Sequence, residues 1–423
     1  MGSKLIKAPF LGMLCLLVFN SNIFSQVTIG SNEEPLSGAL LHLTQGTVTK
    51  KGLGLPRVRL NELTPAVGQM AQSINGTGVW DETEHTGLVV YNVIENYDAC
   101  DVNAPQINVG VHIWDGTKWA YVGQERAIRS KEVHEWIDNR DSSNPETYLY
   151  RKFGEAGSWM LESMRATKYD DGLGTGAAIP VYPGTFGIDT PVFTYPNATP
   201  GSWGTAPATW LKSQGLLYNF YGATNNYSPG NIEQGQINGL TPGGSEVENL
   251  GTEGTAPNKY VQGVCPKGWH IPSDREWNKL EKYIYNNIED YSYYSGSDID
   301  NFDPKSWQDK WETMTGDRGA AANNSGYGHG LSMINPCALN GSSTVSKGRS
   351  YSAEMGGFDA QLIGFVYGPN IDLYGKDVYF WSSSVSSSDK AWIRNLGFEH
   401  EPVVRNVINR TDLFSVRCKK DVD

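Results

Sequence analysis

The stretch CPKGWHIPSDREWNKLEKYIYNN, residues 265–287, carries the clearest structural signal in the chain. Ser273 is a strong helix N-cap residue. Glu276, three positions later, completes a capping box in which each side chain bonds to the other residue's backbone N–H. The residues that follow repeat at helical spacing, so the sequence predicts a helix that packs in a core through one apolar face. That face contains Trp277, Leu280, Ile284 and, on its flank, Tyr283.

Four more segments surround this helix, two before it and two after it. Together with CPKGWHIPSDREW they resemble, in the same order, the Fibrobacter succinogenes major paralogous domain family. The resemblance covers roughly residues 141 to 420, and the shared order of five motifs makes it specific. The four segments are YLYRKFGEAGSWMLESMRATKYDDG (148–172), GLLYNFYGATNN (215–226), YFWSSSVSSSDKAWIRNL (379–396) and LFSVRCKK (413–420).

The resemblance implies a fold related to the C-type-lectin-like fold, in the branch of the formylglycine-generating enzymes. Such a domain is α+β, with one or two helices, a small twisted antiparallel sheet and long loops. Its chain ends meet and a late strand carries its last cysteine, which implies a disulfide between Cys265 and Cys418. Closing a loop of about 150 residues stabilises a fold by at most about 5 kcal/mol in the chain-entropy model.

The N-terminus has the order of a secretory signal peptide. Lys4 and Lys7 precede an apolar run from Phe10 to Phe19, and a small residue allows cleavage between Ser25 and Gln26. The run is shorter than the roughly 20 apolar residues of a membrane-spanning helix. We therefore expect an exported protein, at the cell surface or extracellular, with no transmembrane segment in the mature chain.

A lipid anchor on Cys15 is the alternative to a signal peptide of residues 1–25. The preceding Gly12-Met13-Leu14 fits a lipoprotein cleavage box poorly, and the apolar run continues past the cysteine. Signal cleavage leaves four cysteines, an even and sparse number that suits structural disulfides in an exported protein. Beside the pair implied by the resemblance, Cys100 and Cys337 either pair across the two units of the chain or stay free.

Residues 26–124 form a first unit of short apolar, strand-like runs separated by Gly and Pro. In GVHIWDGTKWAYVG (110–123), Asp115-Gly116 favours a type I′ hairpin turn, across which Trp114 and Trp119 pack. The unit resembles β-rich modules of phage tail fibres and of Bacteroidetes surface proteins, which implies a stalk or spacer that sometimes oligomerises. The matching segments are VTIGSNEEPLSGALLHL (27–43), KGLGLPRVRLNEL (51–63), TGLVVYNV (86–93) and WDGTKW (114–119).

Residues 125–140 are charged with scattered apolar positions and predict a short connecting helix before the second domain, residues 141–423. That domain contains two tracts dense in Gly and Pro or in acidic residues, at 170–207 and 227–259. Tracts of this length inside a compact domain are binding loops or disordered insertions.

Composition and motifs argue against several functions. The net charge of −12 and pI near 5.1 disfavour a nucleic-acid partner, because phosphate binding needs a basic surface. Cys337 stands alone, the histidines are scattered and no catalytic or metal-binding motif occurs, so we expect no enzyme and no cofactor. His270 is interpreted as a packed core residue. A structural calcium ion on loop carboxylates such as Asp170 or Asp171 remains an open alternative.

The segment from Ser382 to Asn409 is the best candidate for a ligand face. The resemblance places it on the exposed face of lectin-like domains, where some relatives carry diversified residues. Aromatic, amide and Arg groups suit adaptable recognition surfaces, although an ordinary solvated strand edge is an equally good interpretation. Trp381 and Trp392 are expected in the core. The predicted contact residues are Arg394, Asn395, Phe398, His400, Arg405, Asn406 and Asn409.

These observations favour an exported cell-surface binding protein, or adhesin. A β-rich spacer would present a lectin-like domain that recognises a surface protein or glycan. Two alternatives stay open: a structural or tip subunit of a surface appendage, and an enzyme related to the formylglycine-generating family.

Overall fold

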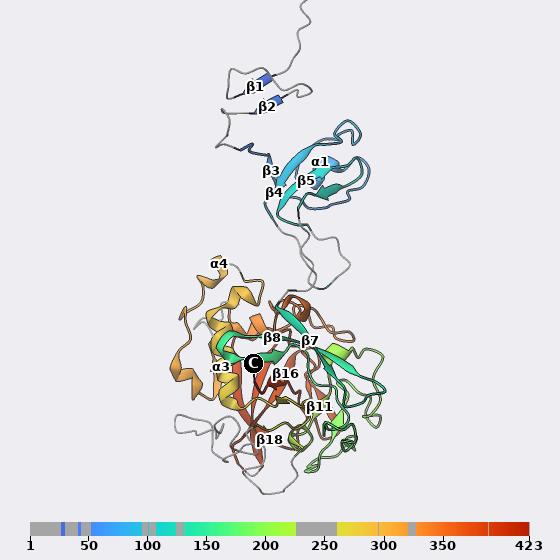
Figure 1. Cartoon of the computed structure of the whole chain (residues 1–423), viewed down its shortest axis with the longest axis vertical. Coiled ribbons are helices and arrows are strands. Elements are labelled where there is room, and N and C mark those ends of the chain that lie inside the picture. The colour runs from blue at the N-terminus through green and yellow to red at the C-terminus, as the bar shows by residue number, and fades with distance from the viewer. Residues whose placement is uncertain are drawn as a thin grey trace, which may run out of the picture. The chain divides into compact units, whose positions relative to one another are not determined.

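The computed structural model divides the chain into two compact units (Figure 1). Unit 1 comprises Met1–Asn96 and Pro105–Gln124, and unit 2 comprises Tyr97–Ala104 and Glu125–Asp423. The expected signal peptide, Cys15 and the tract 227–259 lie outside the described residues. The structure describes residues 27–29, 41–43, 52–94, 100, 107–123, 130, 132–225, 260–294, 296–319, 327–387 and 389–422.

Unit 1 is built on a small sheet whose strands have the order β3-β4-β5-β6. The β3–β4 pair is parallel and the other two pairs are antiparallel. A single turn of helix, α1 (Met70–Ser73), contributes Met70 to a core that includes both tryptophans of the hairpin. The strands are β3 (Arg57–Val58), β4 (Val89–Asn92), β5 (Gly110–Trp114) and β6 (Trp119–Tyr121), and a separate parallel pair joins β1 (Val27–Ile29) to β2 (Leu41–Leu43).

The β5–β6 hairpin confirms the predicted packing of its tryptophans and corrects the turn. The Trp114 and Trp119 rings lie 5.5 Å apart, edge to face. The Asp115 N–H donates to the Lys118 carbonyl, so Gly116 and Thr117 occupy the central turn positions. A type I′ turn needs a positive φ at both central residues, and in this turn Gly116 alone has one. The prediction of a type I′ turn was therefore wrong. The Asp115 carboxylate instead accepts the N–H groups of Thr117 and Lys118, each at 2.8 Å.

Unit 2 contains a five-stranded sheet in the order β12-β19-β9-β8-β7. Lys419 in the last strand pairs with Trp159 near the start of the domain, so the two ends of the domain meet in one sheet. The strands are β12 (Trp269–His270), β19 (Lys419–Lys420), β9 (Ser158–Met160), β8 (Glu146–Lys152) and β7 (Val133–Asp138).

The strand β7 replaces the helix expected in residues 125–140. It pairs antiparallel with β8 from Val133↔Arg151 to Asp138↔Glu146. Val133, Trp136 and Ile137 suit a pleated strand better than an isolated short helix, and the neighbouring strand supplies hydrogen-bond partners that the local sequence cannot show. Residues 133–138 therefore belong to the C-terminal domain rather than to a linker.

A second, four-stranded sheet has the order β13-β18-β17-β16 and is antiparallel throughout. Two short antiparallel pairs complete the strands of unit 2. The strands of the four-stranded sheet are β13 (Gly316–Arg318), β16 (Asp377–Val385), β17 (Lys390–Gly397) and β18 (Val403–Asn409). The short pairs are β10 (Phe193–Thr194) with β11 (Leu217–Tyr218) and β14 (Phe365–Tyr367) with β15 (Asn370–Asp372).

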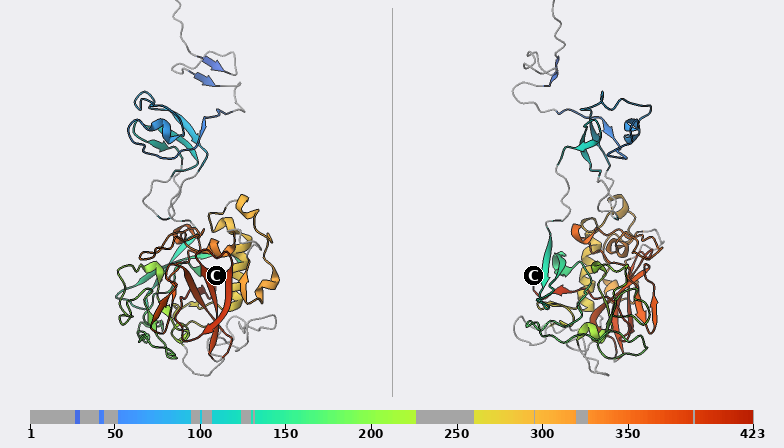
Figure 2. Two further views of the ribbon diagram at one scale, coloured as in Figure 1. Left: turned by 180° about the vertical axis from the view of Figure 1, so that it is seen from behind. Right: turned by 90° about the vertical axis from the view of Figure 1, so that its right-hand side faces the viewer.

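The helix α3 (Asp274–Asn286) packs against this second sheet, as the turned views in Figure 2 also show. Its N-terminus has the predicted capping box. The Glu276 N–H donates to Ser273 Oγ (3.3 Å), and Glu276 Oε2 accepts the Ser273 N–H (2.9 Å). The apolar face is buried, and the Trp277 ring lies 5.5 Å from the Phe380 ring of β16. The other described α-helices are short: α2 (Phe220–Thr224), α4 (Gly296–Ile299) and α5 (His329–Met333).

Two disulfides cross-link unit 2. Cys265 pairs with Cys418, as the resemblance implied, with their Cα atoms 5.9 Å apart. Cys100 pairs with Cys337, with their Cα atoms 5.2 Å apart, so neither of these cysteines is free. Cys100 is assigned to unit 2, so the second bridge is internal to that unit and does not join the two units. Disulfides of this kind indicate an oxidising, extracytoplasmic environment.

The molecule is thus a mixed α/β structure with several small sheets and few helices, preceded by a β-rich module. Within the described part of the chain, every helix is too short or too polar to cross a membrane. Trp381 and Trp392 lie in the core as expected, with 0% and 7% of their surface exposed.

Candidate functional site

The seven residues predicted to contact a ligand do not share one surface. Strand register places Arg394 opposite Arg405, on the sheet face that also carries Phe380 and packs on α3. Asn395 and Asn406 point to the opposite face and are half-buried. The remaining three lie at the ends of β17 and β18 or in the connection between them: Phe398, His400 and Asn409.

Arg394 and Arg405 are buried, with 1% and 0% of their surface exposed, so they are not available on the domain surface. Both bind Asp274, the first residue of α3. Arg394 Nη1 lies 2.6 Å from Asp274 Oδ1, and Arg405 Nε lies 3.0 Å from both carboxylate oxygens. The guanidinium of Arg405 also lies 3.7 Å from the centre of the Trp392 ring.

A second carboxylate extends this buried charge network. Glu281 accepts a hydrogen bond from Arg394 Nε (2.5 Å) and another from Arg318 Nη2. Asn278 lies between the two acids on α3, and its Oδ1 accepts from both Arg318 and Arg394. The network thus fixes the sheet on the helix through three arginines and two carboxylates.

The pKa values of the two acids reflect these contacts. Burial by itself would raise the pKa of Asp274, but the charges of Arg394 and Arg405 outweigh it and hold that pKa below its usual value. Burial also opposes ionisation of Glu281, yet Arg318 and Arg394 lower its pKa to about 2. Both acids are therefore charged at neutral pH, and the network serves the scaffold rather than a ligand.

A signal for this outcome was present in the sequence. Trp392, Arg394 and Leu396 alternate along β17, so an arginine between two core residues points inward with them. Phe398 also packs partly against the core. His400 and Asn409 remain partly or fully exposed, and their role in binding stays a prediction.

A more coherent site lies in a hollow of about 350 Å³ elsewhere in unit 2, which we call the Trp210 pocket. Four separate segments build it: the β7–β8 connection with the start of β8, residues 165–168, Tyr195 after β10, and residues 210–212. None of its residues was among the predicted contact residues, although Tyr195 lies in the tract 170–207 that was interpreted as binding loops or disordered insertions. Its lining includes Asp141, Glu146, Arg165, Lys168, Tyr195, Trp210 and Lys212.

One wall of the Trp210 pocket is aromatic. The Tyr195 and Trp210 rings meet edge to face, with centroids 5.1 Å apart and an interplanar angle of 87°. Trp210 Nε1 donates to the Gly215 carbonyl (2.8 Å), which fixes the indole. Gly215 has φ +69°, and a Cβ there would lie 2.6 Å from Ser163 Cβ, so only glycine brings the carbonyl this close.

The other wall is polar, and its charges are paired. Glu146 accepts hydrogen bonds from Arg165 Nε (2.8 Å) and Lys212 Nζ (2.9 Å). Burial alone would raise the pKa of Glu146, but these two cations lower it below its usual value. Lys168 Nζ lies 3.8 Å from Asp141 Oδ1. The pocket therefore combines paired donors and acceptors with an aromatic surface, an arrangement typical of ligand sites.

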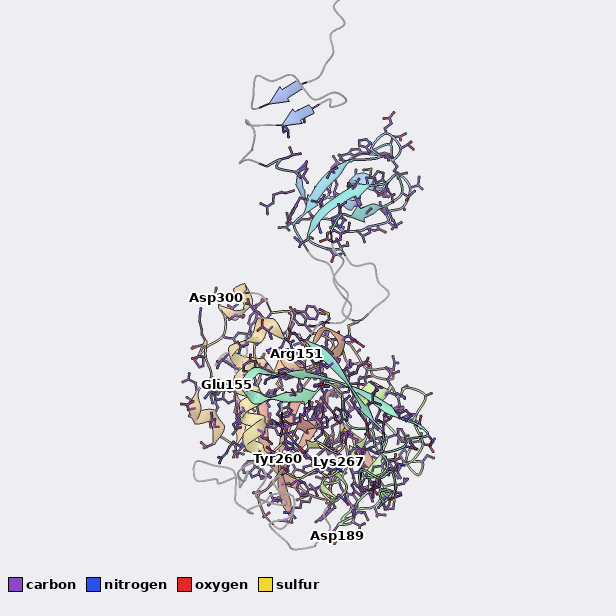
Figure 3. The ribbon with its side chains drawn as sticks, viewed as in Figure 1. Arg151, Glu155, Asp189, Tyr260, Lys267 and Asp300 are labelled. Atoms are coloured by element: carbon purple, nitrogen blue, oxygen red, sulfur yellow. A yellow bond between two sulfur atoms is a disulfide. The ribbon has the colours of Figure 1, made fainter. Side chains whose placement is uncertain are left out.

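Two other pockets lie in unit 2. The larger, about 660 Å³, runs along the exposed side of α3 and is lined mostly by charged and amide side chains, with Tyr283 as its aromatic residue. The other, about 380 Å³, lies on the far side of Arg140 and includes Asp170 and Lys267, the latter labelled in Figure 3.

The carboxylates suggested for calcium are already used by the loop itself. Asp170 accepts the backbone N–H groups of Gly172 (2.8 Å) and Lys267 (2.7 Å). Asp171 accepts from Leu173 N–H and from the Thr175 hydroxyl, whose hydrogen bond is the main cause that lowers its pKa to about 2. Among the described residues, no group of three or more His, Cys, Asp or Glu side chains could hold a metal ion.

His270 is buried, as predicted, but its environment is polar. Its ring nitrogens lie 3.1 Å from Glu276 and 2.8 Å from Asp421, and Tyr260 stacks on the ring. Burial opposes its protonation, but the Glu276 charge outweighs this and raises the pKa of His270. The histidine therefore connects the capping box of α3 to the C-terminal end of the domain.

Comparison with known families agrees with this architecture. The model of the Fibrobacter succinogenes major domain matches residues 155–420. The chain belongs to this family. In the N-terminal part, residues 28–135 match the phage tail like trimerisation region, which confirms the resemblance to tail-fibre modules. No curated protein and no solved structure matches the chain.

Proposed function

We propose that this member of the Fibrobacter succinogenes major domain family is an exported, cell-surface binding protein that recognises a surface protein or glycan. In this proposal, the family domain has a C-type-lectin-like fold whose loops form the recognition site. The meeting of its chain ends in one sheet and its bridge from Cys265 to Cys418 support that relationship.

The proposal depends on one observation: the same chain contains a trimerisation region and a cross-linked domain with an aromatic and charged pocket. Buried ion pairs and two disulfides hold the scaffold, while the pocket residues come from its loops and strand ends. Function in such domains depends on loops positioned by a rigid framework.

Trimerisation would give this binding site three copies. Linked sites raise the overall avidity by about 10²–10⁴-fold when they engage one surface together, even where each site is weak. A surface rich in repeated groups, such as a glycan coat, is the kind of target that benefits from this gain.

The test is binding of the fluorescently labelled full chain to intact bacterial and host cells. We expect saturable binding that excess unlabelled chain displaces, and a trimeric mass by light scattering. Binding that stays linear with concentration, and does not compete, would contradict a specific recognition function.

The trimerisation region also supports a second candidate, a structural or tip subunit of a surface appendage. In that case, the chain would assemble beyond a trimer or join a fibre. The enzyme alternative has less support. An enzyme related to the formylglycine-generating family would use a reactive cysteine, and Cys337, considered for that role, is bound in a disulfide with Cys100.

A further inference from the structure

We propose that the Trp210 pocket binds the ring of a neutral saccharide, stacked on the aromatic side chains and hydrogen-bonded to the paired charges of the same lining. This inference rests on the proposed function and deepens it, since it names both the site and the ligand class.

The aromatic wall provides the stacking surface. Tyr195 and Trp210 are both half-buried, so part of each ring remains open to the hollow. The face of an aromatic ring carries negative potential, which attracts the weakly positive C–H groups on the flat side of a sugar. Since the indole N–H is already bound to Gly215, the ring needs no reordering when a ligand arrives.

The polar wall matches neighbouring hydroxyl groups. Lys212 Nζ and Glu146 Oε1 lie 2.9 Å apart, so a donor and an acceptor stand side by side. A hydroxyl is both donor and acceptor, and two adjacent ones can donate to the carboxylate and accept from the ammonium. Arg165 holds Glu146 from the other side through Nε, and its own guanidinium lies over the Tyr148 ring. The acceptor is therefore fixed in place.

The charge balance selects a neutral ligand. Four cations line the pocket, and three carboxylates line it with them. Arg165 also pairs with a fourth carboxylate, Glu162 (3.2 Å), which makes the numbers equal. A site with equal charges has no net field that would concentrate an acidic sugar.

The size of the pocket favours a short saccharide. Its volume of about 350 Å³ is near the lower end of the range of about 300–1,000 Å³ seen for small-ligand sites. A terminal sugar of a surface glycan fits this limit better than an extended polysaccharide chain.

The test screens the full chain on a printed array of neutral and acidic saccharides, followed by calorimetric titration of each saccharide that binds. Trp210→Ala should weaken binding at least about tenfold, and Lys212→Ala several-fold. Lys212 is 64% exposed, so its variant leaves the core intact even if the Trp210 variant fails to fold. Matched controls are Phe186→Ala, an aromatic residue 58% exposed outside the pocket, and Lys347→Ala, from the exposed pair with Glu399.

The outcomes separate this inference from the proposed function. Weaker binding to a neutral saccharide in both pocket variants, but not in the controls, is the expected result. Unchanged binding in the pocket variants would overturn the pocket while the recognition function stands. Binding to acidic saccharides alone would overturn the ligand class. If the chain binds intact cells but no saccharide, the saccharide inference fails and the proposed function stands. If the chain binds neither, the proposed function fails as well.

Discussion

Two networks of arginines and carboxylates in unit 2 use the same chemistry for different purposes. In the buried network, Arg394 and Arg405 meet Asp274 with almost no exposed surface. At the Trp210 pocket, Glu146 binds Arg165 and Lys212, and Lys212 is 64% exposed. The first network lies between helix and sheet, whereas the second lies at the rim of a hollow.

The difference shows that burial decides what a charged pair does. A buried ion pair costs much desolvation, so removing one partner leaves an uncompensated charge in the core. An exposed pair contributes little to stability, and its donors and acceptors stay available to a ligand. Four predictions test this contrast, and they run from the largest expected effect to the smallest.

Asp274→Ala should destabilise the domain by about 3–5 kcal/mol, because it leaves Arg394 and Arg405 buried without their shared partner. The measurement is the free energy of unfolding in a denaturant titration. Asp309→Ala is the matched control: this carboxylate is 89% exposed and pairs with Lys282 at 3.2 Å. A loss of similar size in both variants would refute the contrast.

Replacing Cys265 and Cys418 together with Ser should cost about 2–5 kcal/mol of stability. It should also weaken ligand binding, because Arg140 in the pocket lining is held by the carbonyl of Val264, next to Cys265. Thermal unfolding and calorimetric titration measure the two effects. Full binding in the folded double variant would show that the pocket does not depend on this bridge.

Stability should fall in acid as the buried network loses charge. The pKa of Glu281 is lowered from 4.5 to about 2 in the folded domain, so its contribution is complete above about pH 4.5. It is lost as the pH falls toward 2, since the unfolded chain then binds the proton more readily. The contribution is of the order of 2–4 kcal/mol. Glu281→Gln should therefore be less stable than the parent at pH 7, and the gap should close toward pH 2 in unfolding titrations.

Lys212→Ala should change stability by less than about 1 kcal/mol, because the ammonium is exposed and Arg165 still neutralises Glu146. Its effect on saccharide binding should be larger than its effect on the melting temperature. A variant that lost several kcal/mol of stability would mean that the pocket rim is part of the scaffold.

Much of the local structure could be predicted from the sequence. The capping box at Ser273 and the apolar face of α3 depend on residues three or four positions apart. The packing of Trp114 on Trp119 depends on a hairpin of six residues, 114–119. The prediction of a helix in residues 125–140 failed at β7. The partner strand β8 supplies hydrogen bonds there that no local sequence pattern reveals.

The candidate site could not be predicted in the same way. Ser382–Asn409 is polar and aromatic in sequence, but strand register turns Arg394 and Arg405 toward α3. The Trp210 pocket joins segments that are separated by up to 74 positions, from Asp138 to Lys212. Tyr148 and residues 165–168 of its lining fall within a family motif, but that motif identifies the family and not a pocket. Tyr195 and Trp210, half-buried aromatic residues outside the regular strands and helices, are the residues of its lining that most suggest a ligand site.

The sequence by itself determined the family, through five motifs in order, and the position and buried face of its main helix, because both rest on short-range patterns. Tertiary structure alone decided which charges are buried and which are open. Asp274 meets Arg394 across 120 positions of chain, and Glu146 meets Lys212 across 66. Whether such pairs lie in the core or at a rim depends on how the sheets and loops close around them, and the solvent exposure that results sets their role.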